Sequence, residues 1–131
     1  MSDINSDNRK VVIELQNVFR DFHVGDETVH ALRGVSFKIY EGEFVTIMGK
    51  SGSGKSTLLN ILAMLDKPTE GRVFLNGTDT ATIKNSQASS FRREKLGFVF
   101  QDFNLLDTFS IRDNIFLPLV LAGCPYREME N

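Results

Sequence analysis

The chain has 131 residues, of which 41% are hydrophobic, which is enough for one domain with a real core. Its net charge is only −2, so no overall basic field favours nucleic acid as a partner, and a single cysteine, Cys124, excludes an internal disulfide. The polar start at residues 1–8 lacks the regions of a signal peptide, and the longest apolar run, 115–122, is too short to cross a bilayer. We therefore expect a cytoplasmic chain.

The pattern before residue 43 is typical of antiparallel β structure. Residues 1–10 are expected to form a disordered leader, and residues 11–15 predict an edge or half-buried strand. Residues 18–22 continue the sheet before a polar turn at 23–27. Apolar and polar side chains then alternate over residues 35–40, which predicts a strand with one solvent-exposed face.

One stretch in the centre of the sequence fits the phosphate-binding pattern G-x-x-x-x-G-K-[ST]. Its fixed positions are Gly49, Gly54, Lys55 and Ser56. The apolar run 44–48 predicts a buried strand just before the pattern, and residues 58–65 predict a helix just after it that begins near Lys55. A chance turn rich in glycine and serine is the alternative, but this strand and helix context favours a phosphate site.

The spacing has a physical reason, because backbone N–H groups must wrap a polyphosphate and bulky side chains would keep them away. The helix that follows adds its unpaired N–H groups and the positive end of its dipole. Lys55 is expected between the β- and γ-phosphates, and the Ser56 hydroxyl on a magnesium ion. The nucleotide-binding residues predicted in this stretch are Gly49, Ser51, Gly52, Ser53, Gly54, Lys55, Ser56 and Thr57.

Shorter elements follow the first helix. Residues 66–71 predict a turn, 72–75 a short strand, 85–95 a helix with a solvated basic end, and 96–100 a second apolar strand. That strand delivers Gln101 to its C-terminal end.

The last part of the chain is predicted to be helical. The sequence from Ser110 to Asp113 resembles a capping box, which opens a helix that runs through Leu121 and is expected to bend at Pro118. A further helix is predicted from residue 126 onwards.

The remaining sequence discriminates between classes of nucleotide protein. A small GTPase should carry Asp-x-x-Gly after the loop, and no aspartate here has glycine three residues later. The chain instead resembles the ATP-binding subunit of ABC transporters from residue 11 to residue 131. The matching stretches are residues 31–37, 42–49, the phosphate loop, 65–71 and 96–101. Residues 91–94 and 103–108 look most like the branch that serves bacitracin-type peptide export, macrolide export and lipoprotein release.

The resemblance implies two further site residues and the cofactors ATP and Mg²⁺. Phe22 matches the aromatic residue that stacks on adenine, where the family usually has tyrosine; its alternative role is in the sheet core. Gln101 matches the glutamine that touches the magnesium ion and reports nucleotide state to the membrane subunit, so Ser56 and Gln101 are the expected metal ligands. A polar strand cap is the alternative for Gln101. Taking 98–102 as a Walker B strand with Asp102 on the metal fits less well.

The fold implied by the resemblance is α/β: a P-loop NTPase core with an antiparallel β subdomain, incomplete because the C-terminal half is absent. Residues 1–131 would be the N-terminal portion of an ABC-type ATP-binding domain. Within it, residues 11–100 would form the β subdomain and P-loop core, and residues 101–131 the Q-loop and the start of a helical subdomain. The implied partners are a membrane permease subunit, which holds the protein at the inner face of the cell membrane, and a second ATP-binding subunit.

The function implied is that of the energy-coupling ATPase subunit of an exporter, truncated before the signature and Walker B motifs that the family needs for hydrolysis. We therefore expect this chain to bind Mg-ATP without turning it over. Two alternatives remain open at this point. One is a noncatalytic nucleotide-binding or regulatory module that docks on a permease, and the other is a nonfunctional truncation product that does not fold alone.

Overall fold

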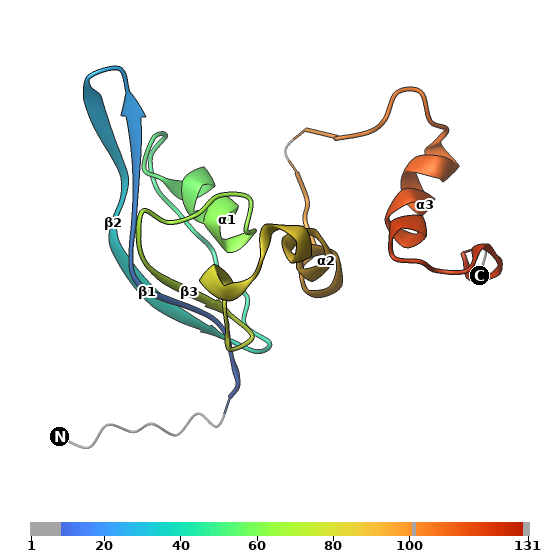
Figure 1. Cartoon of the computed structure of the whole chain (residues 1–131), viewed down its shortest axis with the longest axis horizontal. Helices are drawn as coiled ribbons and strands as arrows, with labels where there is room; N and C mark the ends of the chain where they lie inside the picture. Colours follow the sequence, from blue (N-terminus) through green and yellow to red (C-terminus); the bar gives the residue numbers. More distant parts are fainter. Residues whose placement is uncertain (1–8, 101, 130–131) are drawn as a thin grey trace. The chain divides into compact units, whose positions relative to one another are not determined.

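The computed structural model describes residues 9–100 and 102–129. The chain divides into two compact units, residues 1–88 and 89–131 (Figure 1). The first unit holds a sheet and the helix that follows the phosphate loop. The helix at residues 85–95 begins in the first unit and continues into the second, which also holds the helix at residues 111–121 and a short 3₁₀ turn. No helix in the described ranges is long and apolar enough to cross a membrane.

One antiparallel sheet dominates the first unit, with its strands in the spatial order β2-β1-β3-β4. The strands are β1 (Val11–Val24), β2 (Glu27–Tyr40), β3 (Glu70–Leu75) and β4 (Thr78–Asp79). β1 and β2 form a long hairpin around a turn at Gly25 and Asp26. The antiparallel β region predicted before the loop is therefore confirmed, with the strands expected at 11–15 and 18–22 joined into one.

A bulge at Asn17 explains how β1 places two residues three positions apart in the same core. Leu15 is 2% exposed and Val18 is 0% exposed, although strict alternation would put them on opposite faces. The pairing register of β1 with β2 shifts between them, and Asn17 has a φ of 47°. The Asn17 N–H donates to the Ser36 hydroxyl of β2 at 2.8 Å. The Ser36 side chain thus provides an acceptor for a backbone N–H that the shifted ladder leaves without one.

Helix α1 (Lys55–Leu62) covers one face of the sheet and forms the core with it (Figure 1). Its buried residues Leu58, Ile61 and Leu62 recur at helical spacing. They pack against Leu15, Val18, Leu32 and Val73 of the strands. Burial of each such side chain contributes about 1.5–3 kcal/mol, so this face holds the helix against the sheet. The helix predicted after the loop is thus confirmed, although it ends at Leu62 rather than at residue 65.

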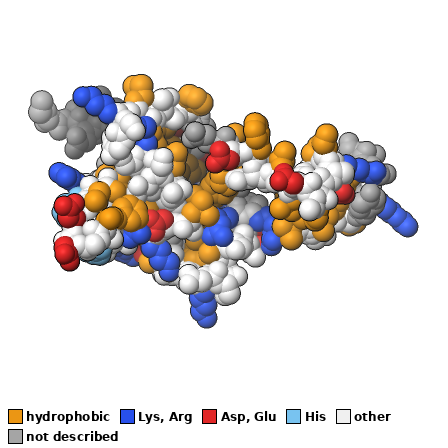
Figure 2. Space-filling model, turned by 90° about the horizontal axis from the view of Figure 1, so that it is seen from above, with side chains coloured by type: hydrophobic (Ala, Val, Ile, Leu, Met, Phe, Trp, Pro, Cys, Tyr) orange, Lys and Arg blue, Asp and Glu red, His pale blue; other side chains and the backbone are white. Residues whose placement is uncertain are grey.

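Two predicted apolar strands are absent from the described structure. Segments 44–48 and 96–100 have no assigned strand, and among the described residues neither joins the sheet. Phe44 is 96% exposed, Met48 is 86% exposed and Val99 is 103% exposed. The prediction of a buried strand at 44–48 and of an apolar strand at 96–100 was wrong, because an apolar strand requires cover and ladder partners, and the described residues supply neither. Figure 2 shows hydrophobic side chains on the visible surface.

The helices after β4 largely match the predictions. They are η1 (Thr80–Thr82), α2 (Asn85–Lys95), α3 (Ile111–Leu121) and η2 (Tyr126–Glu128). The capping box is confirmed: the Asp113 N–H donates to the Ser110 hydroxyl at 3.2 Å, and the Ser110 N–H donates to the Asp113 carboxylate at 3.2 Å. Hydrogen bonds from the Ser110 hydroxyl and N–H lower the pKa of Asp113. The helix predicted from residue 126 is only a single 3₁₀ turn in the described part of the chain.

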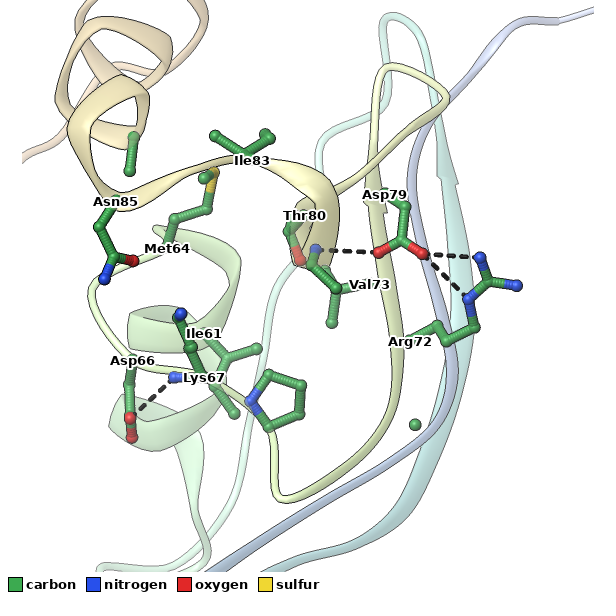
Figure 3. Close-up of a pocket in the computed structure, with 14 residues that line it drawn as sticks. Ile61, Met64, Asp66, Lys67, Arg72, Val73, Asp79, Thr80, Ile83 and Asn85 are labelled. Atoms are coloured by element: carbon green, nitrogen blue, oxygen red, sulfur yellow. Dashed lines mark hydrogen bonds and ion pairs between the residues drawn. The ribbon is translucent and has the colours of Figure 1, made fainter.

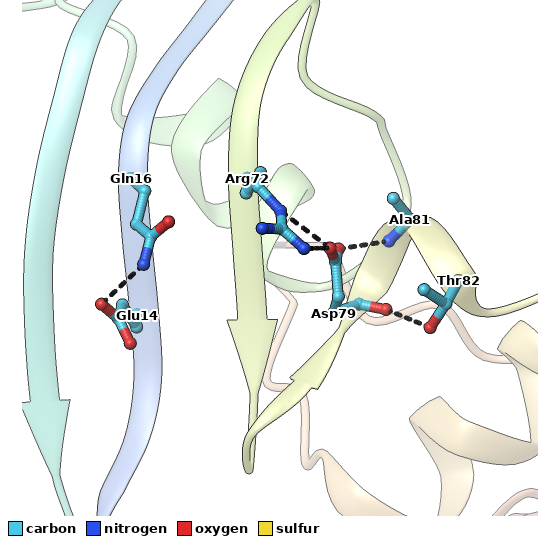
Figure 4. A network of polar contacts seen from close by, with 6 residues as sticks. All are labelled: Glu14, Gln16, Arg72, Asp79, Ala81 and Thr82. Carbon is cyan, nitrogen blue, oxygen red and sulfur yellow. Dashed lines mark hydrogen bonds and ion pairs between the residues drawn. The ribbon is translucent and has the colours of Figure 1, made fainter.

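A polar cluster closes the β3–β4 end of the sheet (Figure 4). The Arg72 guanidinium donates to Asp79 Oδ2 at 2.7 Å and lies 4.9 Å from the Phe74 ring centre. Asp79 also caps η1 by accepting the Ala81 N–H at 2.9 Å. That hydrogen bond and the Arg72 guanidinium hold the pKa of the Asp79 carboxyl below its ordinary value. This arginine stands between a carboxylate and an aromatic ring, an arrangement that recurs near the candidate site.

Candidate functional site

The loop between residue 48 and α1 folds as its glycines require. Gly52 and Gly54 have φ values of 79° and 90°, a region that favours glycine. At Gly54 the approach to β2 adds a second requirement, because a Cβ there would overlap the backbone carbonyl oxygen of Ala31. Gly54 is also the N-cap of α1. The glycine therefore lets the start of the helix lie directly against the strand.

Lys55 folds back over this loop. Its ammonium group donates to the carbonyl oxygens of Gly49 and Lys50, both at 2.7 Å, and lies 3.4 Å from the Ser53 hydroxyl. No carboxylate among the described residues forms an ion pair with it. The loop thus encircles a positive charge that only neutral oxygens compensate, which is an arrangement suited to an anion.

The first turn of α1 adds further donors. No side chain of the described residues caps the helix at Gly54, and the first turn contains no acidic residue. The backbone N–H groups at the start of the helix therefore have no intrahelical acceptor, and the positive end of the helix dipole is uncompensated. Ser56 is exposed and Thr57 is half-buried in this turn. The Ser56 hydroxyl is thus available as a hard oxygen ligand for a metal ion.

An open hollow of about 400 Å³ lies between the loop and β2. Its walls are His30, Ala31, Leu32, Arg33 and Val35 from β2, with Gly52 and Ser53 from the loop. His30 Nδ1 lies 2.8 Å from Asp21 Oδ1 on the neighbouring strand. The hollow therefore borders the β1–β2 hairpin on its β2 side.

Phe22 lies on that hairpin, one pairing step from the wall of the hollow. It pairs with Val29, whereas the adjacent pair is Asp21 with His30. The half-buried ring does not itself line the hollow. The Arg20 guanidinium lies over the ring, 4.4 Å from its centre. Arg20 was not among the predicted site residues, and its only local signal is that it lies two residues before Phe22 on a strand, where side chains share a face.

The structure brings together most of the predicted loop residues. Gly49, Ser53 and Lys55 are in mutual contact, and Ser56 and Thr57 follow in the first helical turn. Gln101 lies outside the described residues, so its predicted place beside the loop stays a prediction. Asp102, the alternative metal ligand, is exposed in an irregular segment.

A second cavity lies at the opposite end of α1 from the phosphate loop (Figure 3). It measures about 190 Å³, and its lining includes Ile61 and Met64 from the end of the helix and Val73 from β3. None of the predicted site residues lines it. Of the two hollows, only the one at the loop end of α1 is lined by predicted site residues, Gly52 and Ser53.

Comparison with known proteins identifies the family. The family model for ABC transporters matches residues 32–131, which is most of the chain. The chain belongs to the ABC transporter ATP-binding family. Within the family it is 50% identical over 121 residues to the ATP-binding protein YvcR of Bacillus subtilis, covering 91% of this chain and 47% of YvcR. It is 46% identical over 117 residues to the macrolide export ATP-binding/permease protein MacB of Brucella abortus, covering 89% of this chain and 18% of MacB.

Solved cassettes of the ABC family have the same fold. MJ0796, from Methanocaldococcus jannaschii, was solved as a dimeric ABC transporter cassette and superimposes with a TM-score of 0.83 at 44% identity, covering 89% of this chain and 52% of that one. A second structure of MJ0796, bound to ADP and Pi after hydrolysis, gives a TM-score of 0.83 at 43% identity. The predicted family and the α/β P-loop fold with an antiparallel β region are thus confirmed. The chain spans about half the length of YvcR and MJ0796.

Proposed function

We propose that this chain supplies the Mg-ATP cradle of the energy-coupling ATPase subunit of an ABC transporter. The observation that carries the proposal is the Lys55 ammonium, held at 2.7 Å from two loop carbonyls at the start of an uncapped helix, with no carboxylate of the described residues paired to it. A phosphate oxygen would accept hydrogen bonds from this ammonium group and from the N–H groups of the loop and of the first helical turn.

The residues present fit both cofactors. For ATP, the cradle consists of Gly49, Ser51, Gly52, Ser53, Gly54, Lys55, Ser56 and Thr57, with Phe22 as the ring that stacks on the base. For magnesium, the Ser56 hydroxyl and the Gln101 amide are the proposed ligands, since both are hard oxygen donors. The magnesium ion, when bound, supplies positive charge beside the phosphates. The chain's own part is to hold and orient the triphosphate.

The relatives support the proposed partners and direction of transport. MacB is an ATP-binding/permease protein for macrolide export, and MJ0796 was solved as a dimer. These support a permease partner, a second ATP-binding subunit, and the exporter branch that residues 91–94 and 103–108 resemble. The chain would then lie in the cytoplasm against the inner face of the membrane.

A noncatalytic nucleotide-binding module that docks on a permease is the alternative function. Measuring ATP hydrolysis alongside ATP binding distinguishes the two.

The base-stacking role of Phe22 gives the first test. We expect the chain to bind ATP with an affinity that magnesium increases, and Phe22→Ala to weaken ATP binding roughly 5- to 150-fold, because base–aromatic stacking contributes about 1–3 kcal/mol. Phe22→Tyr keeps the ring face and should retain most of the affinity. Isothermal titration with ATP and with inorganic triphosphate, which has no base, provides the measurement. Equal ATP affinity in the wild type and Phe22→Ala would show that Phe22 does not stack on the base.

A further inference from the structure

Arg20 contacts two groups at once beside the base-binding ring. Its Nε donates to Asp66 Oδ2 at 2.8 Å, and its guanidinium lies 4.4 Å from the centre of the Phe22 ring. The Arg20 and Asp66 side chains are 24% and 27% exposed, so water only partly screens the pair. A planar guanidinium can bond a carboxylate through its edge while its face stacks on a ring, and lysine cannot do both.

Asp66 is itself held firmly in the turn that follows α1 (Figure 3). Its N–H donates to the Asn60 carbonyl of the helix at 3.2 Å, and its Oδ1 accepts the Lys67 N–H at 2.8 Å. The carboxylate that anchors Arg20 therefore belongs to a turn that is hydrogen-bonded to the helix whose other end is the phosphate loop. Through Arg20, the position of the ring is tied to the same rigid element as the cradle.

The backbone just before Phe22 is tied to Thr69, which lies three residues after Asp66. The Thr69 N–H donates to the Phe19 carbonyl at 2.8 Å, and the Asp21 N–H donates to the Thr69 hydroxyl at 3.0 Å. Phe22 itself pairs with Val29 of β2, so hydrogen bonds fix the strand here, and the contact with Arg20 restricts the remaining freedom, that of the ring. An aromatic ring that is already ordered binds a flat partner with a smaller loss of conformational entropy.

We propose that Arg20 is a positioning residue for nucleotide binding: anchored by Asp66, it covers one face of the Phe22 ring and presents the rest of the half-buried ring to the purine base. This inference rests on the proposed function, because it assumes that Phe22 stacks on the base. It adds that affinity for the base, but not for the phosphates, depends on a residue that acts through the Phe22 ring.

The test compares ligands with and without a base. We expect Arg20→Gln to weaken ATP binding roughly 2- to 10-fold, the size of a partly desolvated cation–π contact, and to leave the affinity for inorganic triphosphate unchanged. Asp66→Asn should weaken ATP binding in the same direction, since it removes the charge that anchors Arg20. In a Phe22→Ala background, Arg20→Gln should have no further effect, because the ring that it positions is gone.

Arg72 provides a matched control, because it also pairs with a carboxylate, Asp79, and stacks on a ring, Phe74. Arg72→Gln should leave the affinities for both ligands unchanged. Circular dichroism melts of every variant establish that each one folds. If Arg20→Gln does not fold, Arg20→Lys replaces it in the test, because it keeps the charge.

Three results would overturn the inference: equal losses for ATP and triphosphate, additive losses in the Phe22→Ala background, or unchanged ATP affinity in Arg20→Gln. Failure of the proposed function is a different outcome. If the wild-type chain binds neither ATP nor triphosphate, the cradle assignment fails and the role of Arg20 falls with it. If Phe22→Ala weakens ATP binding but Arg20→Gln does not, only the role of Arg20 is refuted.

Discussion

Replacing Lys55 with alanine is expected to weaken ATP binding by roughly 10- to 150-fold, because a hydrogen bond to a charged group contributes about 1.5–3 kcal/mol. The ammonium now lies 2.7 Å from the Gly49 and Lys50 carbonyls, at the centre of the loop. Since it would act on phosphate oxygens, binding of inorganic triphosphate should fall by the same factor. This distinguishes Lys55 from Phe22 and Arg20, whose loss should affect ATP alone.

Lys50→Ala is the control for Lys55→Ala. Lys50 carries the same charge in the same loop, but it is exposed, and its part in the contact with Lys55 is played by its backbone carbonyl. Isothermal titration with both ligands should show at most a small change for this variant. Comparable losses in Lys50→Ala and Lys55→Ala would mean that the loop attracts phosphate by general charge, without a specific role for Lys55.

Gly54→Ala is expected to destabilise the fold strongly. Its φ of 90° is unfavourable for any residue with a side chain, and the added Cβ would overlap the Ala31 carbonyl oxygen, which cannot move without displacing β2. Strain of about 1–2 kcal/mol and overpacking of about 1–3 kcal/mol should together lower the free energy of unfolding by about 2–5 kcal/mol. ATP binding should also be lost, because α1 must move away from the strand.

Gly52→Ala separates these two causes. Gly52 has a similar φ of 79°, but nothing lies within 4 Å of the Cβ that alanine would add. Urea denaturation should therefore show only the backbone term for Gly52→Ala, about 1–2 kcal/mol. If Gly54→Ala is no less stable than Gly52→Ala, the close approach between the loop and β2 does not exist in solution.

The phosphate loop and the antiparallel hairpin were predictable because their signals are local. The four fixed positions of the loop lie within eight residues, and the alternation of apolar and polar side chains in β2 is visible in residues 35–40. The length of β1 was not predicted, since the bulge at Asn17 breaks the alternation that a single strand should show. In the hairpin, local periodicity therefore indicated β strands correctly, but it did not indicate that 11–15 and 18–22 form one continuous strand.

The predicted strands at 44–48 and 96–100 failed for a different reason. Apolar composition indicates that a segment needs cover, but it does not indicate which residues provide that cover. Arg20 was missed because its partner, Asp66, lies forty-six positions away in the sequence, and no periodic pattern connects the two. Contacts of that range depend on how α1 packs on the sheet, which the sequence alone does not reveal.

The most direct test of the central claim is an NMR titration of the isotopically labelled chain with Mg-ATP. If the loop is the nucleotide site, the largest shifts of backbone amide signals should fall on Gly49 to Thr57, with smaller shifts around Phe22. Inorganic triphosphate should reproduce the shifts of the loop but not those near Phe22. Saturable ATP binding that leaves the amides of Gly49 to Thr57 unchanged would contradict the proposed site.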